Sequence, residues 1–350
     1  MTRSSLRAVL VAAALVTGST IGGHSVAVAA TGQDTMLVSN ASHKFVTAEV
    51  GRSGDAFGTS RARADAPGPY EHFTLVPTGN PNSFYLWSNQ AKNYVSAEFA
   101  RTGDQRGVLR ARQTPTAPGP WETFYYLPNS DGTTSIAVYD SSGTRWYVSA
   151  ENGWTGDDYG TLRARSTSPG PWEKFVFTSR YVSGYDDFPT LWRNSKLDQF
   201  YVDPWGWNRE CVVFAAWKIY ENSGGTQQPN GQNAPNDWAS HSIDVNNNWG
   251  FAKDWYAYAV NHKVRNDDSP TVGSIAQWVS NQGWFAAHGH VAVVTAVFPD
   301  GSILVSGYNG HAEGEYRTWY FPHHQTITDS YDGKNLPIVW PEHFLHINGL

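Results

Sequence analysis

The sequence has 350 residues, of which 16% are charged and 14% are aromatic, with 33 Gly and 19 Pro. This composition excludes a disordered chain and a coiled coil, and the net charge of −6 without a long run of Lys or Arg argues against a nucleic-acid partner. A chain of this length is expected to form two domains, because a single hydrophobic core stops growing at roughly 250–300 residues.

The first 30 residues have the order of a secretory signal peptide. Arg3 and Arg7 precede an apolar run over residues 8–16, and a stretch of small residues ends at Ala30. A basic start, a short apolar run and a small-residue cleavage site are typical of segments removed during export. The run is shorter than the ~20 apolar residues that span a bilayer. We therefore expect a secreted, extracellular protein without a membrane span; a short membrane anchor is the alternative.

Three copies of one pattern follow the signal. Each copy begins with an aromatic-Val-Ser/Thr-Ala-Glu segment, at Phe45–Glu49, Tyr94–Glu98 and Tyr147–Glu151. Each continues with Arg-Ala-Arg and then Pro-Gly-Pro-aromatic-Glu-x-Phe. The apolar runs are short and separated by turn residues, which predicts strands without helices. A ~50-residue unit of this kind cannot bury its own apolar face, so we expect the copies to close into one β-trefoil over residues 31–180.

The aromatic side chains of the Pro-Gly-Pro motifs are predicted to lie in the trefoil core; they are Tyr70, Phe73, Trp121, Phe124, Trp172 and Phe175. The motifs resemble the fascin-like branch of the β-trefoils, over roughly residues 35–178. Fascin-like proteins bind actin in animals, and trefoils at large often bind sugars. For an exported chain the resemblance implies a wall or carbohydrate ligand, and a spacer without a ligand is the alternative.

The repeat stops near residue 180, and residues 181–189 have the composition of a connector. Cys211, the single cysteine, then precedes an apolar pattern that ends at Gly224-Gly225. Asn208 is a plausible N-cap, which places Cys211 in the first turn of a helix. Free backbone N–H groups and the positive helix end favour a thiolate there, although the carboxylate of Glu210 would oppose it. A single exported cysteine is either a buried filler or a nucleophile.

A β-hairpin is predicted further along the chain. His290 opens an apolar strand that runs to residue 298, and Asp300-Gly301 predicts a turn into a returning strand over 302–309. A two-residue turn would place Ala292 opposite Asn309 and make His290 and Asn309 diagonal neighbours, roughly 7–8 Å apart at the backbone. A base on one strand with an orienting amide on the next is the arrangement that cysteine catalysis requires.

Taken in order, these segments resemble the CHAP domain, the cysteine- and histidine-dependent amidohydrolase/peptidase family. The matching segments are Cys211–Trp217, Trp249–Trp255, Val272–Ala276, Gly289–Val294 and Asp300–Asn309. The resemblance implies a papain-like α+β fold over residues 190–350, hydrolysis of amide bonds in peptidoglycan, Cys211 as nucleophile and His290 as base. Many members carry a Glu two residues before the Asn, where this chain has Gly307. Asn309 must then orient His290 alone, or another carboxylate must help.

Other candidate residues have weaker support. His288 is the rival base, and Trp205 and Trp207 are candidates to contact substrate, although core packing explains them equally well. The later histidines lack metal-binding partners at a suitable spacing, so we expect no metal and no cofactor; they are His323, His324, His343 and His346.

The sequence thus predicts a two-domain secreted peptidoglycan hydrolase, with an all-β trefoil that binds wall or glycan and a papain-like α+β cysteine hydrolase that works through an acyl-thioester. We expect a monomer. One alternative is a secreted binding or adhesion protein whose papain-like domain is inactive. Another is a cysteine peptidase that acts on peptides outside the wall.

Overall fold

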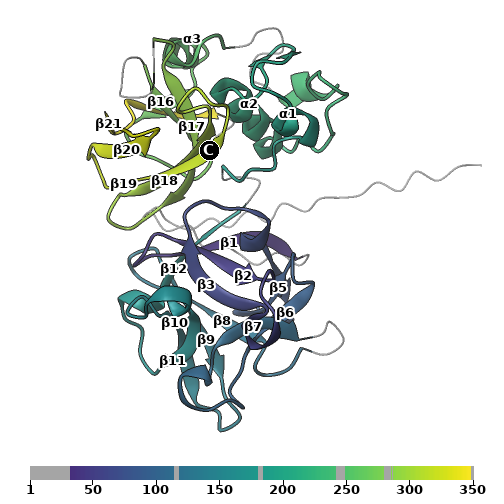
Figure 1. The fold of residues 1–350 in the computed structure, drawn as a ribbon, viewed down its shortest axis with the longest axis vertical. Coiled ribbons are helices and arrows are strands. Elements are labelled where there is room, and N and C mark those ends of the chain that lie inside the picture. Colours follow the sequence, from purple (N-terminus) through teal and green to yellow (C-terminus); the bar gives the residue numbers. More distant parts are fainter. Residues whose placement is uncertain are drawn as a thin grey trace, which may run out of the picture.

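The computed structural model describes residues 32–113, 118–179, 184–241, 249–279, 285 and 287–347. Figure 1 shows two regions, an all-β region built from the first half of the chain and a second region that contains the α-helices. The expected signal peptide and residues 181–183 of the expected connector lie outside the described residues. Within the described residues, no helix is both long and apolar enough to cross a membrane.

The first region is one 12-stranded sheet in which each sequence copy supplies four strands. The first copy forms β1 (Gln33–Ser39), β2 (Phe45–Glu49), β3 (Thr59–Ala64) and β4 (Phe73–Pro77). The second forms β5 (Ser83–Ser88), β6 (Asn93–Ala97), β7 (Leu109–Gln113) and β8 (Thr123–Pro128). The third forms β9 (Thr134–Tyr139), β10 (Arg145–Ala150), β11 (Leu162–Ser166) and β12 (Lys174–Thr178).

The first and fourth strands of the copies close into a ring. β1 pairs with β4 and β12, β5 pairs with β4 and β8, and β9 pairs with β8 and β12, all antiparallel. The second and third strands form the hairpins β2–β3, β6–β7 and β10–β11, which contact one another through β3–β7 and two isolated bridges. The six strands of the ring form a closed barrel, so none of them has a free edge. We call the whole first region the barrel. This arrangement is consistent with the trefoil expected from the repeats.

The Pro-Gly-Pro motifs confirm half of the core prediction and correct the rest. Phe73, Phe124 and Phe175 are fully buried, as predicted, but Tyr70 and Trp172 are 44% and 36% exposed. Their motifs fold as short 3-10 turns, Pro69–Glu71 and Pro171–Glu173. The Glu of each turn points inward and accepts the backbone N–H of the Gly before the second Pro, at 2.8 and 2.7 Å. Tyr70 and Trp172, which precede these Glu residues, are turned outward. Trp121 stays partly buried against the core, although Glu122 accepts the N–H of Gly119 in the same way at 2.7 Å.

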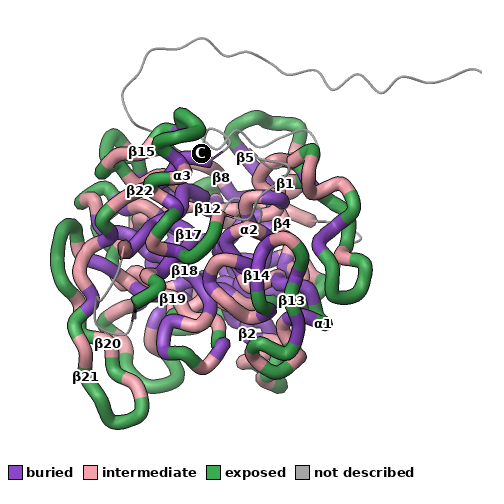
Figure 2. The backbone as a smooth tube through the Cα atoms, turned by 90° about the horizontal axis from the view of Figure 1, so that it is seen from above, coloured by how far each residue is buried: buried purple, intermediate pink, exposed green. Residues whose placement is uncertain are grey.

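The second region has three α-helices and a six-stranded antiparallel sheet among its described residues. The helices are α1 (Thr190–Asn194), α2 (Cys211–Asn222) and α3 (Trp255–Asn261). The sheet, in spatial order, is β15 (Arg265–Asp267), β22 (His343–His346), β16 (Ile275–Trp278), β17 (His290–Val297), β18 (Ile303–Tyr308) and β19 (Tyr316–Phe321). Two short hairpins accompany it, β13 (Tyr201–Val202) with β14 (Gly206–Trp207), and β20 (Ile327–Tyr331) with β21 (Lys334–Ile338). Figure 2 shows β17 and β18 as mostly buried and the β20–β21 hairpin as largely exposed.

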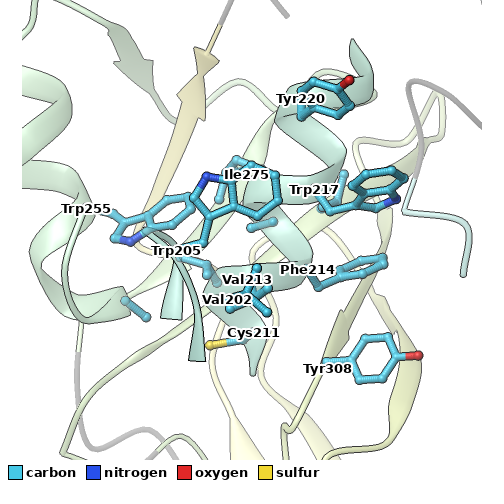
Figure 3. Packing of buried hydrophobic residues seen from close by; sticks show 14 of the residues in the cluster. Val202, Trp205, Cys211, Val213, Phe214, Trp217, Tyr220, Trp255, Ile275 and Tyr308 are labelled. Atoms are coloured by element: carbon cyan, nitrogen blue, oxygen red, sulfur yellow. The ribbon is translucent and has the colours of Figure 1, made fainter. Parts of the chain in front are cut away.

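Strand β17 has apolar neighbours on both faces. Val291 and Val293 belong to the hydrophobic cluster that contains α2, while Ala292 and Val294 belong to a second cluster with Trp278. Successive side chains of a strand point to opposite faces, so the two clusters lie on the two sides of the sheet. Figure 3 shows the α2 side of this packing.

Beyond Val294 the strand also contacts the barrel. Ala296 and Phe298 share an apolar cluster with Met36 and Val38 of the barrel. In addition, Thr178 Oγ1 donates a hydrogen bond to the carbonyl of Thr295 at 2.8 Å. The two regions therefore meet through buried apolar side chains.

Candidate active site

Helix α2 begins at Cys211, as predicted, but its N-cap is Glu210 and not Asn208. Asn208 is fully buried, and its side-chain amide accepts the N–H of Phe200 at 3.0 Å and donates to the carbonyl of Lys196 at 2.9 Å. Arg209 has a φ of 65°, so the chain turns between Asn208 and the helix. The helix ends at Asn222, just before the expected glycine pair, and Gly224 has a φ of 92°.

The thiol of Cys211 lies at the buried N-terminal end of α2. Its side chain belongs to the same cluster as Val213 and Val291, and Figure 3 shows Sγ directed away from Phe214 and Tyr308. Burial, reinforced by the neighbouring carboxylate of Glu210, raises the pKa of the thiol to about 12. Hydrogen bonds from the backbone N–H groups of Val291, Val212 and Cys211 itself act in the opposite direction. The backbone N–H groups at the helix end therefore lower the pKa of the thiol, as expected, but burial and Glu210 raise it by more.

His290 is the first residue of β17 and is 3% exposed. Its ring stacks on Phe285 with centroids 4.1 Å apart and lies 6.0 Å from Trp278 and 5.8 Å from Trp319. These aromatic side chains belong to the cluster on the opposite face of the sheet from Cys211. Burial, with a smaller contribution from His311, lowers the pKa of His290 to about 3. Both His290 and Cys211 are thus uncharged at neutral pH in this arrangement.

A close approach of the backbone holds His290 in place. Gly289 has a φ of 71°, and a Cβ there would lie 2.4 Å from the carbonyl oxygen of Trp278. Only glycine fits this position without a shift of the backbone. The neighbouring carbonyl of His288 accepts the N–H of Lys253 at 2.9 Å, which joins the start of β17 to the segment before α3.

The predicted hairpin forms, but its register differs from the expected one. Val293 pairs with Ser306, a bulge follows between Val294 and Ala296, and Phe298 donates its N–H to the carbonyl of Ser302 at 2.9 Å. The turn therefore contains three residues and not two, because the Asp300 side chain accepts the N–H of Ser302 and widens it. Continuing the observed pairing places Ala292 opposite Gly307, so the expected pairing of Ala292 with Asn309 is wrong.

Asn309 follows β18 in a left-handed conformation, with a φ of 61°. Its Nδ2 donates to Oε1 of Glu210 at 2.7 Å, and its Oδ1 accepts the N–H of Gly314 at 2.7 Å. The amide thus joins the loop after β18 to the residue before Cys211. No hydrogen bond links Asn309 to His290, although both residues are described.

Gly307 lies in close contact with the start of β17, directly beside His290. The Nε2 atom of His290 is buried and has no hydrogen-bond partner among the described residues. A Cβ at Gly307 would lie 3.5 Å from this nitrogen and 3.3 Å from the Cβ of Ala292. A longer side chain at residue 307 would therefore begin directly beside the ring. This is the position at which many CHAP domains carry a Glu.

The two candidate tryptophans have different environments. Trp205 is 7% exposed and packs edge-on against Trp192 and Trp238, so it is a core residue. Trp207 is 49% exposed on β14 and pairs with the exposed Tyr201, with ring centroids 5.6 Å apart. Of the two tryptophans, Trp207 alone is accessible from solution.

The remaining histidines have separate partners. His288 is exposed and stacks on Phe251 with centroids 4.4 Å apart. His343 stacks on Tyr256, and Nε2 of His346 lies 3.0 Å from Asp267. His323 and His324 are exposed and pack near Trp340. Across the described ranges, no group of three or more His, Cys, Asp or Glu side chains is arranged to hold a metal ion.

Two residues near the site have contacts that the sequence did not indicate. Glu210 contacts Asn309, and burial raises its pKa. His311 has a fully buried side chain, with Nε2 2.5 Å from Asp329 and Nδ1 3.5 Å from Glu313. His311 lies two residues after Asn309, but its partner Asp329 comes from a distant hairpin, so no local spacing indicated the pair.

Comparison with known protein families identifies the second region. The CHAP domain family matches residues 200–309, a segment that includes Cys211, His290 and Gly307. The chain therefore carries a C-terminal CHAP domain. CHAP domains are typical of amidases and peptidases, many of which hydrolyse bonds of the cell wall. No curated protein matches the chain.

Several solved structures resemble part of the chain at low similarity. The designed threefold-symmetric protein ThreeFoil is 19% identical, covers 41% of this chain and 96% of its own, and has a TM-score of 0.34. The exo-β-1,3-galactanase 1,3Gal43A from Clostridium thermocellum is 16% identical, with 41% of this chain and 30% of its own covered and a TM-score of 0.35. A Caenorhabditis elegans protein of unknown function is 9% identical, and the match covers 45% of this chain and 99% of that protein, with a TM-score of 0.37. Similarity this low carries no conclusion about function.

Proposed function

We propose that the protein is a secreted, monomeric peptidoglycan hydrolase. Its papain-like CHAP domain would cleave amide bonds of the peptide stem or cross-bridge, and its N-terminal β-trefoil would bind the wall or its carbohydrate. One observation carries the proposal: the single cysteine is the first residue of α2, inside the CHAP match, with backbone N–H groups directed at its Sγ.

The proposed reaction uses Cys211 as nucleophile and His290 as base. His290 takes the thiol proton as Sγ attacks the substrate carbonyl carbon, and an S–C bond forms. The C–N bond then breaks, and the imidazolium returns the proton to the leaving amine. Water adds to the acyl-thioester with His290 again as base, which releases the new carboxylate and restores the thiol. The side chains of Cys211 and His290 lie on opposite faces of the sheet that contains β17. The His290 side chain must therefore rotate toward Cys211 before the first step.

The backbone around Cys211 supplies the charge stabilisation in this proposal. The N–H groups at the start of α2 are donors that the helix itself leaves unpaired, so they are suited to bind a developing oxyanion. The carboxylate of Glu210 would oppose negative charge on Sγ, and Asn309 holds that carboxylate through its Nδ2. Trp207, exposed four residues before Cys211, is the proposed contact for the substrate.

A second function is favoured by a specific observation. Nε2 of His290 has no hydrogen-bond partner among the described residues and Gly307 offers no side chain, so no described polar group orients the ring for catalysis. A secreted binding or adhesion protein with an inactive papain-like domain would tolerate this arrangement.

Zymography on purified peptidoglycan, with mass analysis of the released fragments, tests the proposal. The wild type should release fragments with new stem-peptide ends, and Cys211→Ala should release none while it keeps its fold by circular dichroism. His288→Ala is the matched control, because this exposed histidine lies two residues from His290, and it should stay near wild type. Lysis by Cys211→Ala would contradict the assigned nucleophile. Wall binding without lysis by the wild type would favour the inactive alternative, and cleavage of soluble peptides alone would indicate a peptidase outside the wall.

A further inference from the structure

The three copies of the barrel are joined by equivalent contacts at two of their three junctions. After its second strand, each copy forms a short 3-10 turn that carries an Asp, and these turns are Gly54–Ala56, Gly103–Gln105 and Gly156–Asp158. Arg52 of the first copy binds Asp157 of the third with both nitrogens, each at 2.9 Å. Arg101 of the second copy binds Asp55 of the first in the same way, at 2.9 and 3.2 Å.

The third junction lacks this ion pair. Trp154 stands at the position that Arg52 and Arg101 occupy in the other copies, and Asp104 is the carboxylate that it faces. Asp104 is contacted by Nη1 of Arg163 at 3.3 Å, and its side chain remains 82% exposed. The bidentate contact that closes the other junctions is therefore absent here.

A second departure from the repeat occurs at the same junction. Nε of Arg61 donates to the hydroxyl of Thr161, and Nε of Arg110 donates to that of Thr59, both at 3.2 Å. The matching position for Arg163 is Val108, which has no hydroxyl. Arg163 donates instead to the carbonyls of Arg106 at 2.9 Å and Gly103 at 2.8 Å, and its guanidinium lies 5.9 Å from the Trp154 ring.

A shallow, solvent-open cavity of about 380 Å³ lies at this junction, and most of its lining residues are exposed. Its lining residues come from the loops of the second and third copies and are Asp104, Gln105, Gly153, Trp154, Thr155 and Asp158. The volume lies in the range of ~300–1,000 Å³ that is typical of small-ligand sites. Arg52 and Arg101 bridge the other two junctions, so this cavity lies where Trp154 replaces the bridging arginine.

The lining chemistry matches a neutral polyhydroxylated ring. Trp154 offers an aromatic face for the apolar side of a pyranose, while Asp104 and Asp158 offer acceptors for hydroxyl groups. Trp172 extends the aromatic surface, because a Cβ added at Gly153 would lie 3.0 Å from its ring. A cationic ligand is disfavoured, since the guanidinium of Arg163 already lies near the Trp154 ring.

We propose that this cavity, the Trp154 junction, binds a pyranose-containing glycan, so that the barrel has one asymmetric binding site despite its three copies. The proposal deepens the wall-binding role proposed above and rests on it. It places glycan recognition between the second and third copies and gives Trp154 the largest share of the contact.

Binding of the full chain to purified sacculi and to tetra-N-acetylglucosamine, measured by sedimentation and calorimetry, tests the site. All variants carry Cys211→Ala so that bound walls are not cut. Trp154→Arg should restore the ion pair with Asp104, fill the cavity and weaken binding roughly tenfold or more, as expected for a central aromatic contact. Its melting temperature should not fall, which separates loss of binding from loss of fold. Arg52→Ala is the control, because it changes the equivalent position of the first copy, and it should bind like the parent.

Each remaining result has a separate meaning. Parent-like binding by Trp154→Arg, on a chain that does bind walls, would overturn the site and leave the proposed wall binding intact. Displacement of the oligosaccharide by tetramethylammonium would overturn the glycan assignment in favour of a cation site. If the parent bound neither sacculi nor oligosaccharide, the wall-binding function and the site would both be wrong.

Discussion

The barrel and the CHAP domain place buried charges in different ways. In the barrel, Arg61 pairs with Glu49 and Arg110 pairs with Glu98, so the same contact recurs in successive copies. In the CHAP domain, the fully buried Lys218 has no repeated counterpart and binds Asp187 and Glu221, at 3.1 and 2.6 Å. In the barrel, a departure from the repeat therefore identifies a candidate site. In the CHAP domain, each functional residue must be judged from its own geometry.

The largest expected effects test the equivalence of the barrel copies. Phe73→Ala, Phe124→Ala and Phe175→Ala each remove a fully buried ring from the same core position. Each should lower the free energy of unfolding by about 3–5 kcal/mol, since loss of a buried Phe leaves a cavity. Urea denaturation followed by barrel tryptophan fluorescence measures this. Unequal losses would mean that the copies contribute differently to stability, and Tyr70→Ala, at an exposed position, is the control.

The next largest effect concerns Asn309, whose contacts with Glu210 and Gly314 are not repeated as the barrel contacts are. Asn309→Ala should lower kcat by roughly tenfold or more, because general acid–base catalysis typically contributes about 10²–10⁴-fold and requires a positioned base. If Asn309 acts by holding Glu210, Asn309→Asp should be no better than Ala, because it brings a second carboxylate to a contact of 2.7 Å. If it orients His290 during turnover, Asn309→Asp should retain more activity than Ala. Asn309→Gly controls for backbone strain at the φ of 61°.

Gly307 allows the activity of the CHAP domain to be shifted by pH. Gly307→Glu starts a side chain 3.5 Å from Nε2 of His290, and a carboxylate there should raise the pKa of His290 from about 3 by roughly 1–3 units. A base is active when unprotonated, so the acidic limb of the kcat/KM profile should move to higher pH. Gly307→Gln, which adds the bulk without the charge, should leave the limb in place. An unmoved limb in a folded Gly307→Glu variant would mean that the His290 ring does not lie beside residue 307 during turnover.

The smallest effect concerns Glu210 and the thiol. With a thiol pKa of about 12, alkylation of Cys211 by iodoacetamide should keep rising with pH beyond the ordinary value near 8.5. Glu210→Gln removes the carboxylate that helps to raise this pKa, so alkylation at pH 8 should become faster, by up to about tenfold for each unit of pKa lost. Glu315→Gln, which changes an exposed carboxylate of the same region, is the control. A plateau near neutral pH in the wild type would show that the thiol is already activated.

Local patterns in the sequence predicted much of this molecule. Turn residues between short apolar runs predicted strands in the first half, and the apolar run after His290 predicted a strand that begins at that residue. Cys211 was expected in the first turn of α2 because an apolar helical pattern and a glycine stop followed it. These features depend on neighbours within a few residues, where backbone preferences and side-chain spacing decide the structure.

The sequence determined the repeats, the strands and helices, and the candidate pair of Cys211 and His290. These features depend on backbone preferences and motifs that involve only residues close together in the sequence. Tertiary structure alone decided the rest. One extra residue in the turn at Asp300 and the bulge between Val294 and Ala296 together changed the hairpin register by two residues. Asn309 contacts Glu210 and Gly314. Packing placed the His290 ring in an aromatic cluster and turned Tyr70 outward. These outcomes depend on residues far apart in the chain, whose contacts exist only after the barrel and the sheet have closed.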